Sequence, residues 1–211
     1  MELINKILRE ISSEKSVIID LGCGDGFIER NISEVKFKEW HAIDPTELLI
    51  KKSKPVGQMF FHIGDSDLLP QLPKPDILFT VRTLINIPNQ KREYQKIAKA
   101  CHSDTKIFFC EASIQGLKKI NSARKFFKLP VIAPIQFNKY INEKELEETF
   151  EILHIEHFAS SYYFGSRIVN ALINIKKQNY YDPVNVYFKD IPPFGEWGVH
   201  RMFYLKKKIK K

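Results

Sequence analysis

Short apolar runs alternate with amphipathic segments along the first half of the chain. Five of the apolar runs have the length and composition of buried strands: residues 16–20, 39–44, 58–65, 75–81 and 106–113. Helical spacing or helix-start signals mark the intervening stretches 27–35, 45–53 and 91–102. Strands that alternate with helices in this way predict an α/β fold with a doubly wound, mostly parallel sheet.

The pattern changes after Ser113. Residues 116–140 are basic and aromatic and are punctuated by Pro130 and Pro134, which is typical of an insertion, and we expect it to pack over the sheet. Residues 142–150 then predict a short helix with Asn142 as its cap.

The remainder of the chain completes the predicted sheet. Residues 151–158 and 200–207 are the last two strand candidates, which brings the predicted sheet to seven strands. Residues 160–173 predict a helix, and residues 190–198 predict a proline-rich loop. We therefore expect a single domain over residues 1–211, with lid or substrate insertions at 114–141 and 160–199.

Composition narrows the class of protein. The chain has 211 residues, 44% hydrophobic and 27% charged, which suits one globular core, and no apolar run approaches the roughly 20 residues that span a bilayer. The N-terminal segment is unlike a signal peptide. Cys23, Cys101 and Cys110 lie far apart without a C-x-x-C pair, which argues against a metal site or disulfides and favours a cytoplasmic location. The sequence carries no signal for an oligomeric state.

The net charge is +8, and the chain ends in a lysine-rich tail, residues 204–211. Such a tail is typical of a solvated end. The alternative is weak attraction to an anionic partner, such as a membrane surface, nucleic acid or an acidic substrate.

The most informative motif is a glycine turn directly after the first predicted strand. Asp20 is followed by Gly22, Gly24 and Gly26, a G-x-G-x-G spacing that differs from the nicotinamide fingerprint G-x-G-x-x-G, and the chain has no P-loop. Ligands of open α/β sheets bind at the carboxyl ends of the strands. An acid at this place would repel a phosphate and favour a ligand that carries positive charge.

This acid with its three glycines resembles the first motif of class I S-adenosylmethionine-dependent methyltransferases, a Rossmann-like fold. The resemblance continues at Asp44, which matches the acid that holds the two ribose hydroxyls, and at Asp65 with Ser66, where the adenine amino group is received. Residues 81–88 match the segment that lines the methionine portion, so the resemblance covers residues 17–111, about half of the chain.

The resemblance implies S-adenosylmethionine as cofactor and S-adenosylhomocysteine as product, and no metal. The cofactor-binding residues that it implies are Asp20, Gly22, Cys23, Gly24, Gly26, Asp44, Asp65, Ser66, Val81 and Arg82. Tight-turn and capping roles are the structural alternatives for the glycines and for the acids.

The acceptor is less defined. Residues 81–84 read Val-Arg-Thr-Leu in place of the (N/D)-P-P-(Y/F/W) motif of enzymes that methylate amino groups of nucleobases or glutamine. Late segments of the chain also resemble small bacterial methyltransferases of poorly defined substrate. We therefore expect methylation of a small molecule at oxygen, on a hydroxyl or a carboxylate, with a sugar-like acceptor as one form.

Four residues are candidates for the catalytic side: Glu111, Arg82, Tyr162 and Arg167. Glu111 and Arg82 lie at carboxyl ends of strands, where an acid could act as base and a cation could hold an anion. Their alternatives are a structural hydrogen bond and a surface ion pair. Tyr162 and Tyr163 with Arg167 suggest a wall with one cation, although core packing is the alternative for the tyrosines.

His157 and His200 are further bases, but single histidines on apolar strands are more typical of the core. Two other functions remain open: an RNA or protein methyltransferase, although no RNA-binding module is present and nucleic acid is not expected, and a catalytically inactive module that binds the cofactor or a partner.

Overall fold

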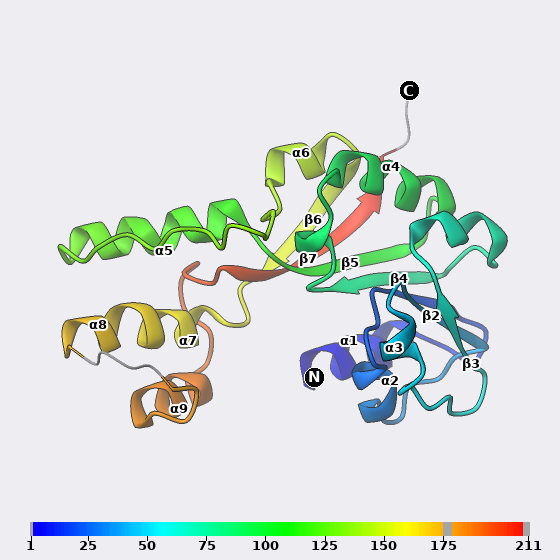
Figure 1. Cartoon of the computed structure of the whole chain (residues 1–211), viewed down its shortest axis with the longest axis horizontal. Helices are drawn as coiled ribbons and strands as arrows, with labels where there is room; N and C mark the ends of the chain where they lie inside the picture. The colour runs from blue at the N-terminus through cyan, green and yellow to red at the C-terminus, as the bar shows by residue number, and fades with distance from the viewer. Residues whose placement is uncertain (1, 175–178, 209–211) are drawn as a thin grey trace.

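The computed structural model describes residues 2–174 and 179–208 and has one seven-stranded sheet with the order β3-β2-β1-β4-β5-β7-β6 (Figure 1). The strands are β1 (Val17–Leu21), β2 (Glu39–Asp44), β3 (Met59–Ile63), β4 (Ile77–Val81), β5 (Lys106–Ala112), β6 (Phe150–Glu156) and β7 (His200–Lys207). Strands β1 to β5 are parallel, and β7 runs antiparallel to both β5 and β6. The predicted doubly wound, mostly parallel sheet is confirmed, and its order reverses between β1 and β4.

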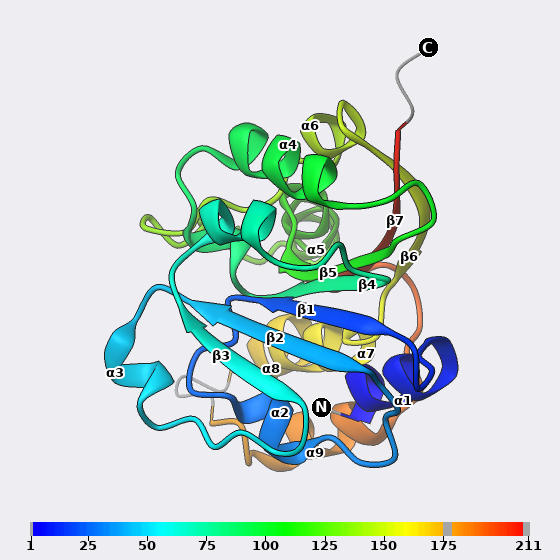
Figure 2. The same ribbon diagram turned by 90° about the vertical axis from the view of Figure 1, so that its right-hand side faces the viewer.

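Helices cover both faces of the sheet (Figure 2). They are α1 (Glu2–Ile11), α2 (Phe27–Asn31), α3 (Glu47–Ile50), α4 (Gln90–Ala100), α5 (Ile114–Phe126), α6 (Glu143–Glu147), α7 (Ser160–Phe164), α8 (Asn170–Leu172) and α9 (Pro183–Asp190). Two 3-10 turns, η1 (Ser66–Gln71) and η2 (Leu84–Asn86), and one π turn, η3 (Gly165–Val169), complete the structure.

Two apolar cores lie on opposite faces of the sheet, because successive side chains of a strand point to opposite sides. Ile18 of β1 packs with Leu8 of α1 and Trp40 on one face. Ile19 packs with Tyr94 of α4 on the other. Strands buried on both faces read as continuous apolar runs, which is why the sequence located them correctly.

Helix α2 is shorter than the predicted 27–35. It ends at Asn31, whose side-chain amide donates to the Phe27 carbonyl oxygen at 2.7 Å, and Ile32 is already extended. Asparagine, isoleucine and serine are weak helix formers, so the amphipathic spacing of this stretch overstates the length of the helix.

The two inserted segments form one lobe, defined here as residues 114–141, 160–174 and 179–199. Their shared core contains Leu117 and Ile120 of α5, Ile168 of η3 and Val199. Helix α5 and helices α7 to α9 extend toward the same end of the molecule, at the left of Figure 1. The predicted packing of the 116–140 segment over the sheet is therefore wrong. Helix α5 begins directly after β5 and continues away from the carboxyl end of the strand, and it packs on the second insertion instead.

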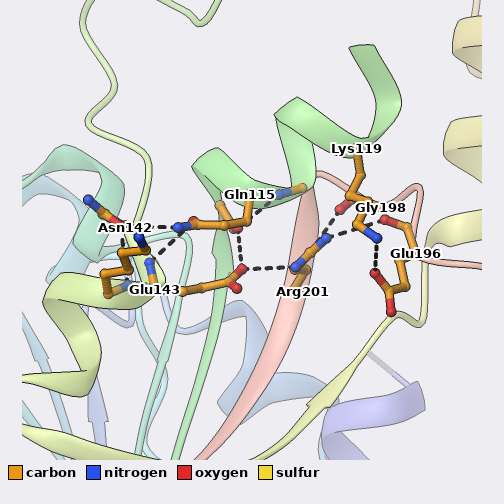
Figure 3. Close-up of polar contacts among 10 residues, drawn as sticks. Gln115, Lys119, Asn142, Glu143, Glu196, Gly198 and Arg201 are labelled. Carbon is orange, nitrogen blue, oxygen red and sulfur yellow. Dashed lines mark hydrogen bonds and ion pairs between the residues drawn. The ribbon is translucent and has the colours of Figure 1, made fainter. Parts of the chain in front are cut away.

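A buried polar network fixes the lobe to the sheet (Figure 3). Arg201 of β7 pairs with Glu143 of α6 at 2.9 Å, and the same Glu143 oxygen accepts a hydrogen bond from the Ser113 hydroxyl at 2.7 Å. Ser113 also caps α5, since its oxygen accepts from the Gly116 N–H at 3.0 Å. The first turn of α5 is thus tied to β7 and α6 together.

Within the described ranges, no helix has the length and apolarity that a transmembrane span requires, and no cluster of histidine, cysteine and acidic side chains is arranged to hold a metal ion. Cys23, Cys101 and Cys110 are free and buried. Residues 209–211 of the lysine-rich tail and residues 175–178 of the second insertion lie outside the described residues.

Candidate functional site

The glycine turn after β1 combines three backbone conformations that favour glycine. Gly22, Gly24 and Gly26 have φ values of 90°, 60° and 73°. A Cβ on Gly22 would lie 2.0 Å from the Thr83 hydroxyl oxygen, so this glycine lets the turn touch the loop after β4. A Cβ on Gly24 would meet no heavy atom within 4 Å. Gly24 is therefore the point where a ligand can approach the backbone.

Asp44 at the end of β2 holds the glycine turn in place. One carboxylate oxygen accepts from the Gly24 N–H at 3.0 Å, and the other accepts from the Thr46 N–H at 2.8 Å. Each carboxylate oxygen has a second acceptor position. Asp44 can therefore support the turn and still accept hydrogen bonds from a ligand.

A cavity of about 570 Å³ opens beside Asp44, and we call it the acidic cavity. Its lining residues include Asp44, Asp65, Ser66 and Glu93. Asp65 caps η1 by accepting from the Asp67 N–H at 2.8 Å, the capping role that sequence allowed as the alternative. The Ser66 hydroxyl oxygen is buried and has no hydrogen-bond partner among the described residues. This wall therefore combines acceptors with one unsatisfied polar group.

A second cavity of about 520 Å³ lies on the other side of the glycine turn, and we call it the aromatic cavity. Its lining is dominated by apolar and aromatic side chains: Ile4, Phe27, Ile28, Val81, Phe158, Tyr162 and Tyr163, with Cys23, Cys110 and His200. Burial raises the pKa of the Cys23 thiol, and Asp20 raises it further, so the thiol is neutral. Gly22, Gly24 and Arg82 line both cavities.

Arg82 stands at the junction of the two cavities. Its backbone has a φ of 56°, which is uncommon for a residue other than glycine, and its N–H donates to the Cys110 carbonyl oxygen at 2.9 Å. Among the described residues Arg82 forms no ion pair. The alternative of a surface ion pair is therefore not supported, and the guanidinium is available to an anion in either cavity.

Tyr163 of α7 and His200 of β7 form a hydrogen-bonded pair in the wall of the aromatic cavity, between the phenol oxygen and Nδ1. Burial lowers the pKa of His200 to about 4, with a smaller contribution from Arg82. Burial also raises the pKa of Tyr163 to about 12. Both side chains are therefore neutral near pH 7. When Nδ1–H donates to the phenol oxygen, Nε2 is a free proton acceptor.

Asp20 lies beneath the glycine turn and lines neither cavity. Its side chain is 0% exposed, and neither carboxyl oxygen accepts a hydrogen bond from an N–H or hydroxyl group of the described residues; its hydrogen-bond partner is the carboxyl group of Glu29. Glu29 of α2 is 2% exposed beside it, and one Glu29 oxygen accepts from the Trp40 indole N–H at 3.1 Å. Burial, followed by the neighbouring Glu29, raises the pKa of Asp20 well above its ordinary value. Asp20 and Glu29 together therefore hold a proton more tightly than exposed acids do.

Glu111 is also fully buried, but it is satisfied by the protein. One oxygen accepts from the Thr80 hydroxyl at 2.8 Å and from the N–H groups of Thr83 and Leu84 at 2.9 and 3.0 Å. The other accepts from the Ile85 N–H at 3.4 Å. The side chain does not reach either cavity, so the structure supports a positioning role for Glu111 and not that of a base.

The remaining predicted residues divide into two groups. Cys23 and Val81, which the sequence assigned to the cofactor, and Tyr162, which it assigned to the catalytic side, all line the aromatic cavity. Arg167 is exposed on η3 and is not among the lining residues, although it lies close enough to Tyr163 to lower the pKa of that phenol.

Sequence reasoning missed several wall residues of the aromatic cavity, among them Ile4, Asp25 and Phe158, and set His200 aside. The available signals were the amphipathic N-terminal helix, the place of Asp25 within the glycine turn and the place of Phe158 at the end of the predicted strand 151–158. A larger cavity, of about 780 Å³, lies elsewhere, between α4 and the end of β7, and contacts Lys91, Lys99, Glu148 and Lys207 but not the glycine turn.

No protein-family model matches the chain, and no curated protein matches it in sequence. Solved structures match it over nearly its whole length. An S-adenosylmethionine-dependent methyltransferase from Mesorhizobium loti has a TM-score of 0.59 and 15% identity, covering 98% of this chain and 96% of that chain.

Two other solved structures show how widely this fold is used. A mycolic acid cyclopropane synthase in complex with S-adenosylhomocysteine has a TM-score of 0.59 and 11% identity, covering 98% of this chain and 84% of that chain. The cyclase SpnF has a TM-score of 0.58 and 12% identity, covering 98% and 81%. Similarity at such low identity concerns the fold, which also carries other chemistry. The chain thus has the Rossmann-like fold of S-adenosylmethionine-dependent methyltransferases.

Proposed function

We propose that this chain is an S-adenosylmethionine-dependent methyltransferase that methylates a small molecule at an oxygen atom. The observation that carries the proposal is the pair of cavities that meet at Gly22, Gly24 and Arg82. One is lined by acids at the carboxyl ends of β2 and β3, and the other is mainly apolar. They lie at the point where the strand order reverses between β1 and β4, which is where open α/β sheets bind their ligands.

The residues of the acidic cavity fit the adenosyl part of the cofactor. Ribose carries two adjacent hydroxyl donors, and Asp44 has acceptor positions beyond those that its two backbone hydrogen bonds use. The adenine amino group is a donor that suits Asp65, and the unpartnered Ser66 hydroxyl offers a further polar contact. The open space above Gly24 leaves room for close approach to the backbone.

When bound, S-adenosylmethionine supplies an electrophilic methyl group on a sulfonium. The residues of this chain would position the acceptor, since displacement at carbon depends strongly on alignment. Arg82 can hold a carboxylate of the cofactor or of the acceptor. The walls of the aromatic cavity would enclose the apolar part of the acceptor and exclude water.

Oxygen acceptors arrive in one of two protonation states. A hydroxyl acceptor would lose its proton to Nε2 of His200, with Tyr163 orienting the imidazole. A carboxylate is already ionised and needs only Arg82 for orientation. The low pKa of His200 makes it a weak base, and the apolar lining offers few partners for a polyol. These two features favour a carboxylate on a largely apolar molecule over a sugar.

Calorimetric titration with S-adenosylmethionine and S-adenosylhomocysteine tests the cofactor assignment. We expect binding by the natural chain and a loss of about 1–3 kcal/mol in Asp44→Ala, the range for charge-assisted hydrogen bonds. Asp67→Ala is the matched control, because Asp67 is an acid of η1 that pairs with Lys96 and lines neither cavity. Absence of any binding by the natural chain would contradict the proposal.

A second experiment separates the two kinds of acceptor. Labelled cofactor is incubated with host-cell extract, and the labelled product is identified. If the acceptor is a hydroxyl, His200→Gln should slow turnover by roughly 100-fold or more while cofactor affinity is retained. If it is a carboxylate, His200→Gln should have little effect and Arg82→Ala should raise KM for the acceptor.

A further inference from the structure

One segment of the lobe differs in charge from the rest of the molecule. Residues 114–141, which we call the arm, contain six lysine or arginine residues and no aspartate or glutamate. The arm consists of α5 and the chain that returns from it, and it extends away from the sheet at the left of Figure 1. Two hydrogen bonds between Asn121 and Ile132, of 2.8 and 2.9 Å, hold the returning chain against α5.

Several cations of the arm have no protein anion to neutralise them. Lys118, Lys125 and Lys128 are exposed and form no ion pair with any residue in the described ranges. Lys119, in contrast, pairs with Glu196 at 2.8 Å. The outer part of the arm therefore presents uncompensated positive charge.

The arm also exposes large apolar side chains, at the end of α5 and along the chain that returns to the sheet. Phe126 ends α5, whereas Phe137 lies nearer the sheet, two residues before Lys139, whose N–H donates to the Ile85 carbonyl oxygen at 2.8 Å. Phe126 is 82% exposed and Phe137 is 84% exposed, and Phe127, Val131 and Ile135 are exposed as well. Phe126 and Phe127 contact each other edge to face, with their ring centroids 5.1 Å apart. A soluble surface rarely leaves aromatic side chains so fully in water at the end of a projection unless they contact something.

Cations interleaved with exposed phenylalanines match a surface that is anionic outside and apolar beneath. Lipid headgroups attract lysine and arginine, and the acyl boundary accepts aromatic side chains. A folded acidic protein would match the charge of the arm, but it would need a groove or a flat face to dock on, and the arm is a projection. Nucleic acid would match the charge but gains little from valine and isoleucine. We propose that the arm docks this protein on an anionic membrane surface, with Phe126 and Phe127 at the end of α5 inserted among the lipid headgroups.

The test is co-sedimentation of the full chain with vesicles of phosphatidylcholine and phosphatidylglycerol, compared with vesicles of phosphatidylcholine alone. We expect binding to the anionic vesicles that weakens with salt. Phe126→Ser/Phe127→Ser and Lys125→Glu/Lys128→Glu should each reduce the partition coefficient roughly tenfold or more.

Two control variants carry the same kinds of change at the other end of the molecule. Leu48→Ser removes an exposed apolar side chain of α3, and Lys52→Glu/Lys54→Glu reverses two exposed charges that follow it. Both should bind vesicles as the natural chain does. Thermal unfolding followed by circular dichroism confirms that all variants are folded.

Four outcomes would overturn the proposal. They are no binding to anionic vesicles, equal binding to neutral vesicles, full binding by both arm variants, and loss of binding only when Lys206–Lys208 and the residues after them are removed. Two further results would also overturn the proposal. If the arm variants change the oligomeric state measured by light scattering, the arm contacts a second copy of the chain. If the arm binds an RNA oligonucleotide and not vesicles, its partner is nucleic acid.

Discussion

The turn after β1 lies over the buried acid Asp20, and the loop after β4 lies over the buried acid Glu111. The two acids differ in the hydrogen bonds that the protein gives them. Glu111 accepts four hydrogen bonds, three of them from consecutive backbone N–H groups of the loop after β4. Asp20 accepts none from an N–H or hydroxyl group of the described residues, and its hydrogen-bond partner is a second buried acid, Glu29. Both are 0% exposed.

This difference shows that burial alone does not assign a role to an acid. An acid that accepts hydrogen bonds from backbone N–H groups fixes a loop, and its removal lowers the free energy of unfolding. An acid whose hydrogen-bond partner is another buried acid has no donor or cation to stabilise its charge, and such groups are common at places where a ligand uses them. We therefore expect substitution of Glu111 to change mainly the stability of the protein, and substitution of Asp20 to change mainly its ligand binding.

The largest effect is expected for Glu111→Ala. The substitution would leave the N–H groups of Thr83, Leu84 and Ile85 without an acceptor, and each buried orphan donor costs about 1–3 kcal/mol. Allowing for relaxation and water entry, we expect the free energy of unfolding to fall by about 3–5 kcal/mol. Urea denaturation measures it, and Glu111→Gln, which keeps an acceptor oxygen, should lose less. A stable Glu111→Ala protein would remove the positioning role.

The pH dependence of stability gives a smaller effect at the same residue. Burial raises the pKa of Glu111 from 4.5 to about 7 in the folded protein. A raised pKa means that the folded state binds the proton more tightly than the unfolded state does, so protonation of Glu111 stabilises the fold. This contribution to the free energy of unfolding is complete below about pH 4.5 and is lost as the pH rises through about 7.

We therefore expect the stability of the natural chain relative to Glu111→Gln to decline over this interval by roughly 2–3 kcal/mol. Urea denaturation of both proteins across the interval provides the measurement. A difference that stays constant with pH would show that Glu111 keeps one protonation state throughout.

The smallest effect concerns Asp20, and it appears in binding. The raised pKa of Asp20 means that it and Glu29 bind a proton more tightly than exposed acids do, and a bound cation would favour release of that proton. If S-adenosylmethionine is the ligand, its binding should release protons, and its affinity should increase with pH because the released proton is taken up by the solution.

Asp20→Asn should leave the unfolding free energy within about 1 kcal/mol and weaken binding roughly tenfold, with little pH dependence remaining. Titration calorimetry in buffers of different ionisation enthalpy counts the protons. Proton release that is unchanged in Asp20→Asn, together with a large loss of stability, would make Asp20 the structural acid and would reverse the comparison.

The parts of the fold that depend on local pattern were predictable from the sequence. Buried parallel strands are apolar throughout, so the first five strands and the positions of Asp44 and Asp65 at strand ends followed directly. The direction of α5 did not follow, because it depends on contacts with Ile168 and Val199 far along the chain.

The same limit applies to the site. Glu111 could be placed at the mouth of the sheet from its position in the strand, but its donors lie 26 to 31 residues away. Tyr163 and His200 are 37 residues apart, and nothing in either neighbourhood marks them as a pair. Local pattern located the acids, and tertiary contact decided which of them could face a ligand.

The backbone at Arg82 has a consequence for how this protein would respond to selection. A left-handed conformation costs a residue other than glycine roughly 1–2 kcal/mol, and the loop requires it so that Thr83 and Leu84 can reach their acceptor. Glycine at position 82 would relieve that cost. Selection for thermal stability alone would thus favour loss of Arg82, the cation that lines both cavities. The more stable protein would then bind anionic groups less tightly.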